Sequence, residues 1–167
     1  MAYRVVVIED TPELLEDIVM VLRKSPDFEV SSTYKTAGAA MGPAAMFHPN
    51  LFLINIDSEE SLNALAAFVD TFPGAYILGT MAQWDPVKAQ RALESGVTGC
   101  ILKPFGSKEV LEYLQLYSIR GKHKPARNIA FFSPKGRAGR TARAPPASGD
   151  IPRDSLNASW IVITFAI

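Results

Sequence analysis

The chain has 167 residues, of which 48% are hydrophobic, so it is long enough to form a domain with a substantial apolar core. Its single cysteine, Cys100, excludes an intramolecular disulfide, and no apolar run approaches the ~20 residues of a membrane-spanning helix. We therefore expect a cytoplasmic protein with no membrane segment.

The net charge of zero conceals an uneven distribution along the chain. Residues 1–119 hold 15 acidic and 8 basic side chains, which gives −7, whereas residues 120–167 hold 2 acidic and 9 basic ones, which gives +7. Such an asymmetry is typical of two segments with different roles. We predict a folded domain over residues 1–120, followed by a basic linker or tail over residues 121–167.

Apolar strand-like runs alternate with helix-like stretches through about residue 120, and this alternation predicts a parallel sheet flanked by helices. The second helix, expected over 36–47, should be kinked or shortened, because Pro43 lies in its interior. The expected strands are residues 4–8, 28–30, 51–56, 75–79 and 99–102. The other expected helices are residues 11–22, 61–71, 85–95 and 107–117.

Polar residues directly follow four of these apolar runs. The acidic pair Glu9-Asp10 follows the first run, Asp57 the third, Thr80 the fourth and Lys103 the fifth. In a parallel sheet these ends meet at one edge, where such folds bind ligands. The sequence therefore predicts a pocket with three carboxylates, one hydroxyl and one ammonium.

Like charges gathered in this way need a cation. Two carboxylates about 4 Å apart repel by roughly 4 kcal/mol at an effective dielectric constant near 20. Mg²⁺ prefers carboxylate oxygens and leaves room for phosphate oxygens. In the field of Mg²⁺ and Lys103, one carboxylate could attack a phosphoryl donor and form an acyl phosphate.

As a set, these residues resemble the motifs of the receiver domain of bacterial two-component response regulators, over residues 3 to about 118. The resemblance implies a flavodoxin-like α/β fold, with a doubly wound sheet of order 2-1-3-4-5 and helices on both faces. It implies that Asp57 is the phospho-acceptor, that Thr80 and Lys103 contact the phosphoryl group, and that the Lys103–Pro104 bond is a candidate for cis geometry.

The resemblance also implies a cofactor and partners. Asp57 would receive its phosphoryl group from a sensor histidine kinase or a phosphotransfer protein. A homodimer could form through the fourth helix, fifth strand and fifth helix. No enzymatic turnover is expected beyond the phosphorylation and dephosphorylation of the chain itself. The implied Mg²⁺ ligands are Glu9, Asp10, Asp57 and the backbone carbonyl of Glu59.

Three departures from the family pattern leave a second interpretation open. Cys100 stands where the family has a switch aromatic residue, the loop over 58–61 lacks the usual Met-Pro and Gly residues, and the chain from Asp57 to Thr80 is short. The alternative is a phosphorylation-independent interaction scaffold, a pseudo-receiver, in a pilus-assembly or partition-type system.

The basic tail contains a second resemblance. Residues 129–141 resemble a degenerate, truncated start of the deviant Walker A motif of partition and pilus-assembly ATPases, but Arg137 replaces a glycine and Arg140 the phosphate-binding lysine. Because 26 residues follow Thr141, we expect no nucleotide hydrolysis. We favour a solvated linker over nonspecific nucleic-acid binding for residues 120–143, and expect strand-like runs at 128–132 and 160–167.

Overall fold

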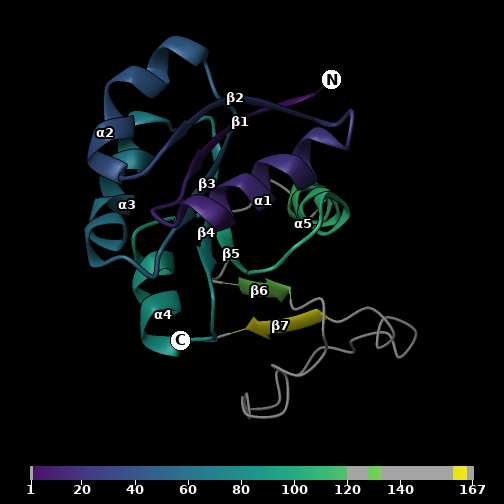
Figure 1. Ribbon diagram of the computed structural model, residues 1–167. Coiled ribbons are helices and arrows are strands. Elements are labelled where there is room, and N and C mark those ends of the chain that lie inside the picture. Colours follow the sequence, from purple (N-terminus) through teal and green to yellow (C-terminus); the bar gives the residue numbers. More distant parts are fainter. Residues whose placement is uncertain (1, 120–127, 133–159, 165–167) are drawn as a thin grey trace.

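The computed structural model describes residues 2–119, 128–132 and 160–164, and within them a parallel five-stranded sheet has the order β2-β1-β3-β4-β5 (Figure 1). The predicted flavodoxin-like order is thereby confirmed. The strands of this sheet are β1 (Tyr3–Ile8), β2 (Phe28–Tyr34), β3 (Leu51–Asn55), β4 (Tyr76–Met81) and β5 (Gly99–Leu102). The helices are α1 (Pro12–Arg23), α2 (Ala37–Met41), α3 (Glu59–Thr71), α4 (Pro86–Glu94) and α5 (Ser107–Ile119), with a 3₁₀ helix, η1 (Pro43–Phe47).

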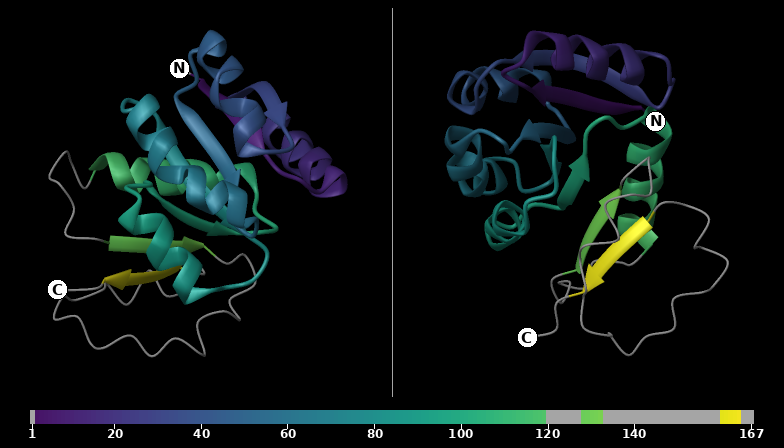
Figure 2. Two further views of the ribbon diagram at one scale, coloured as in Figure 1. Left: turned by 90° about the vertical axis from the view of Figure 1, so that its left-hand side faces the viewer. Right: turned by 60° about the horizontal axis from the view of Figure 1, so that its bottom comes forward.

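Each face of the sheet packs against its own set of helices. Successive side chains of a strand point to opposite faces, so Val5 and Val7 join a buried cluster with α1 and α5, whereas Val6 and Ile8 join one with α2, α3 and α4. The helices accordingly lie in two layers on either side of the strands (Figure 2). Burial on both faces explains why β3 reads as a nearly continuous apolar run.

The predicted break in the second helix is confirmed. The α-helix α2 ends at Met41, and the chain continues through Gly42 into η1, which begins at Pro43. Proline has no N–H to donate and clashes with the preceding turn, so an uninterrupted helix over 36–47 is not accessible.

Local capping sets the start of α3 and α4. Asp85 Oδ1 accepts hydrogen bonds from the amides of Val87 and Lys88, as expected for the start of α4. Helix α3 starts at residue 59, two residues before the predicted start, because Ser58 Oγ accepts from the Ser61 amide. This earlier start moves Glu59 from a loop into the first turn of α3.

The two strand-like runs predicted in the C-terminal segment pair with each other. Strands β6 (Asn128–Phe132) and β7 (Trp160–Thr164) form an antiparallel ladder, and β6 is the member of the pair nearer β5 (Figure 1). The segment that resembles a Walker A motif lies outside the described residues beyond β6. Among the described helices, none is both long and apolar enough to cross a membrane.

Candidate functional site

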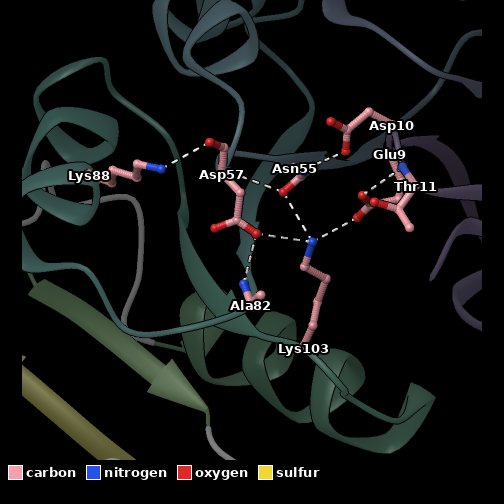
Figure 3. Close-up of polar contacts among 8 residues, drawn as sticks. All are labelled: Glu9, Asp10, Thr11, Asn55, Asp57, Ala82, Lys88 and Lys103. Atoms are coloured by element: carbon pink, nitrogen blue, oxygen red, sulfur yellow. Dashed lines mark hydrogen bonds and ion pairs between the residues drawn. The ribbon is translucent and has the colours of Figure 1, made fainter.

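The carboxyl ends of the parallel strands meet at one edge of the sheet, and the side chains predicted from the sequence gather there (Figure 3). Lys103 follows β5 and reaches back across this edge. Its Nζ lies 2.8 Å from Glu9 Oε2 and 3.3 Å from Asp57 Oδ2. The predicted meeting of strand ends from positions 9 to 103 is therefore present in the fold. The Lys103–Pro104 peptide bond is cis, as anticipated.

Lys103 and Glu9 form a nearly buried ion pair. Their side chains are 5% and 1% exposed, so neither charge has bulk water as an alternative partner. Burial raises the pKa of Glu9, while the hydrogen bond and charge of Lys103 act in the opposite direction without cancelling it. The Thr11 amide donates to the second oxygen, Glu9 Oε1, at 3.3 Å. Both carboxylate oxygens of Glu9 are thus engaged by the protein.

Asn55 occupies the centre of the site, and the sequence analysis gave it no role. Its Oδ1 accepts from Lys103 Nζ at 3.1 Å and from the Asp57 amide at 3.1 Å, and its Nδ2 donates to Asp10 Oδ1 at 2.8 Å. The residue is 4% exposed. It is the one polar side chain of β3, and a buried polar group requires hydrogen-bond partners. That signal in the sequence could have identified it.

The Asn55 carboxamide therefore links Asp10 to Lys103 by hydrogen bonds. Burial acts to raise the pKa of Asp10, but hydrogen bonds with Glu9 and from Asn55 outweigh it, and the pKa is lowered. A lowered pKa means that the environment favours the ionised carboxylate. The Asn55 amide group is thus a neutral partner for a charged Asp10.

Asp57 lies two residues beyond the end of β3 and, besides the bond from its amide to Asn55, has three partners. Its Oδ2 accepts from the Ala82 amide at 2.9 Å and lies within ion-pair distance of Lys103, while its backbone carbonyl accepts from Lys88 Nζ at 2.9 Å. The side chain is 34% exposed, which makes it the more open of the two carboxylates paired with Lys103. Lys88 comes from the first turn of α4, and no motif in the sequence pointed to it.

Thr80 lies on β4, next to β3, and Cys100 lies on β5, the strand beyond β4. Thr80 is paired in register with Asn55 and is 1% exposed, and its Oγ1 has no hydrogen-bond partner within the described residues. Cys100 is fully buried, and burial raises the pKa of its thiol to about 12. The position assigned to a switch aromatic therefore holds a small, neutral side chain that has no route to solvent.

Glu59 makes its contacts away from the acidic pair. Its carboxylate oxygen Oε2 lies 3.1 Å from Nη1 of Arg91, a residue of α4, and forms an ion pair with it. The second terminal nitrogen of Arg91, Nη2, donates to Asn63 Oδ1 at 2.6 Å. This ion pair is exposed and contributes little to stability. Together with the Lys88 contact, however, it joins α4 to the start of α3 and to the loop before it.

The donor set does not fit a magnesium ion in this arrangement. Within the parts of the chain that the structure describes, no three His, Cys, Asp or Glu side chains are grouped closely enough to hold a metal. Of the predicted ligands, Glu9 is paired with Lys103, Asp10 with the Asn55 amide group, and the Asp57 carboxylate with Lys103 and the Ala82 amide. Figure 3 shows Asn55 between Asp57 and Asp10.

Comparison with solved structures identifies the fold. The chain is similar to the signal receiver domain of NarL from Mycobacterium tuberculosis, with 24% identity and a TM-score of 0.61 over 70% of this chain and 97% of that one. It is similar to a LuxR-family DNA-binding response regulator from Staphylococcus aureus, with 19% identity and a TM-score of 0.61 over 69% and 98% of the two chains.

A third similar structure is the signal receiver domain of a modulated diguanylate cyclase from Desulfovibrio desulfuricans G20, with 15% identity and a TM-score of 0.63 over 72% of this chain and 96% of that one. No protein-family model and no curated protein matches the sequence. The described domain thus has the fold of a response regulator receiver.

Proposed function

We propose that this chain is a receiver-fold interaction module that acts without accepting phosphate, as a cytoplasmic, non-enzymatic component of a pilus-assembly or partition-type system. The observation that carries this proposal is the central position of Asn55, whose carboxamide lies between Lys103 and Asp10. A carboxamide has no charged oxygen with which to attack phosphorus, so the group at the centre of the site cannot form an acyl phosphate.

The surroundings of Asp57 support the same conclusion. Its Oδ2 already accepts the Ala82 amide and approaches Lys103, and Lys88 holds its carbonyl. Backbone amides and ammonium groups are the donors that stabilise a bound anion. In this site the Asp57 carboxylate itself takes these donors, which a transferred phosphoryl group would need.

The proposed system is suggested by the segment after the receiver fold. Strand β6 leads into residues 133–141, whose sequence resembles the phosphate-binding loop of partition and pilus-assembly ATPases. The replacements at Arg137 and Arg140 remove the features that bind phosphate closely. We therefore assign this chain a role in protein contacts of such a system and none in nucleotide hydrolysis.

A second function, phosphorylation at Asp57, is favoured by one observation. The Asp57 carboxylate is 34% exposed and lies 3.3 Å from Lys103 Nζ. A carboxylate oxygen would form a bond to phosphorus while the bond from phosphorus to the histidine nitrogen of a kinase breaks, leaving its electron pair on that nitrogen. This function calls for Mg²⁺ and for rearrangement of the present contacts. Phosphorylation would then act on downstream partners through a homodimer formed by α4, β5 and α5.

The two functions are separated by treatment with acetyl phosphate and MgCl₂, followed by intact-mass measurement. We expect no phosphoryl adduct on the wild-type protein, with an active response regulator receiver treated in parallel as the positive control. A stoichiometric adduct that is lost in Asp57→Asn would refute the proposed function and establish the second one. The Asp57→Asn variant is the matched control, because it keeps the shape of the side chain.

A further inference from the structure

The carboxylates of this site are each partnered by groups from the chain itself. Glu9 faces the Lys103 ammonium at 2.8 Å, and Asp57 faces the same ammonium at 3.3 Å and the Ala82 amide at 2.9 Å. Asp10 Oδ1 accepts a hydrogen bond from Asn55 Nδ2 at 2.8 Å. With Lys88 on the Asp57 carbonyl, three negative charges face two positive ones, and neutral donors bind Asp10 and Asp57 as well.

Asn55 can join these groups because a carboxamide is a donor at one end and an acceptor at the other. The nitrogen serves the anion Asp10 and the oxygen serves the cation Lys103. An aspartate in the same position would offer two acceptors, so it could bind Lys103 but would repel Asp10. A site with aspartate there would therefore hold one more unbalanced negative charge near Glu9 and Asp10 and would need an added cation.

We infer that Asn55 makes this site independent of divalent cations, and that the single change Asn55→Asp converts it into a site for Mg²⁺. In the wild-type protein the amide group of Asn55 does for Asp10 what a metal ion would do in a cluster of carboxylates. In the variant, three carboxylates would adjoin one another, and Mg²⁺ takes such oxygen ligands. This inference deepens the proposed function, since a module that accepts no phosphate has no use for the metal.

The test measures thermal unfolding with and without millimolar MgCl₂ at constant ionic strength. The wild-type melting temperature should not respond to MgCl₂, whereas that of Asn55→Asp should fall without metal and rise with MgCl₂ by about 5 °C or more. The matched control is Asn63→Asp, which makes the same chemical change at an exposed residue of α3. It should show no response to MgCl₂.

Two results would overturn the inference. One is a rise in the wild-type melting temperature with MgCl₂, or heat of binding when the wild-type protein is titrated with MgCl₂ in a calorimeter. The other is an Asn55→Asp protein that does not respond to MgCl₂. If this variant is unfolded without metal, recovery of its circular dichroism in MgCl₂ but not in NaCl supports the inference, and failure to recover refutes it. Because these measurements use no phosphoryl donor, they can fail while the mass assay still supports the proposed function.

Discussion

The ion pair between Lys103 and Glu9 makes the strongest prediction about stability. In Lys103→Met the stem of the side chain remains, but Glu9, which is 1% exposed, loses its cation. Removing one partner of a buried pair leaves an uncompensated charge, and such changes cost about 3–5 kcal/mol. We expect a loss of this size at pH 7 in the free energy of unfolding, measured by urea denaturation with circular dichroism.

The same variant should show a diagnostic dependence on pH. Burial already raises the pKa of Glu9, and the variant removes the Lys103 contacts that act to lower it, so the pKa of Glu9 in the folded variant should rise further. An acid with a raised pKa in the folded state loses stability as pH rises through that value, and the loss vanishes below its unfolded pKa of about 4.3. The difference between wild type and variant should therefore shrink as the pH falls from 7 towards 5.

Two further proteins complete this test. Lys108→Met removes an 85% exposed lysine and should change stability by no more than about 0.5 kcal/mol. The double variant Glu9→Gln/Lys103→Met removes the buried charge as well and should recover most of the lost stability. A loss in Lys103→Met below about 1 kcal/mol, or one that is the same at every pH, would refute the assignment of Lys103 and Glu9 as a buried, charged pair.

Two other predictions concern residues beside the site. Cys100, whose thiol pKa burial raises to about 12, should resist alkylation in the native protein at pH 8 and react once urea unfolds the chain; rapid native labelling would contradict its burial. Asp85→Ala removes the acceptor for two amides at the start of α4 and should cost about 1 kcal/mol in urea denaturation, whereas Asp85→Ser should retain most of the stability; equal losses in both variants would show that capping is not the role of Asp85.

The strand order and the edge of the sheet where the site lies could be predicted because the sequence shows clear apolar runs with polar ends. Buried parallel strands read as apolar runs, and their polar ends must meet at one edge. The central residue was harder to predict because it depends on where one strand ends. Asn55 and Asp57 are two positions apart, so they would share a face only if the strand continued to Asp57. Because β3 ends at Asn55, that side chain reaches Lys103 and Asp10 first, and Asp57 lies farther out.

The contacts of α4 could not be predicted from periodicity. Whether Lys88 and Arg91 lie on a solvated face or contact another element depends on how α3 and α4 pack. The cap at Ser58 in turn places Glu59 in the first turn of α3. The predicted role of Glu59 as a source of a metal-binding carbonyl assumed a loop at this position. Its contact with Arg91 is a consequence of the helical turn that forms instead.

These contacts bear on how a receiver fold can act without phosphate. Lys88 and Arg91 lie three residues apart and therefore on one face of α4, and they hold the Asp57 carbonyl and the Glu59 carboxylate. Helix α4 is thus tied directly to the loop that leaves β3. A switch would need these ties to break when the charge of the site changes, whereas the carboxylates of the site already have partners in Lys103, the Asn55 amide group and the Ala82 amide. Within the proposed function, the outer surface of α4, where Val87 is 65% exposed, is the surface that a partner would contact.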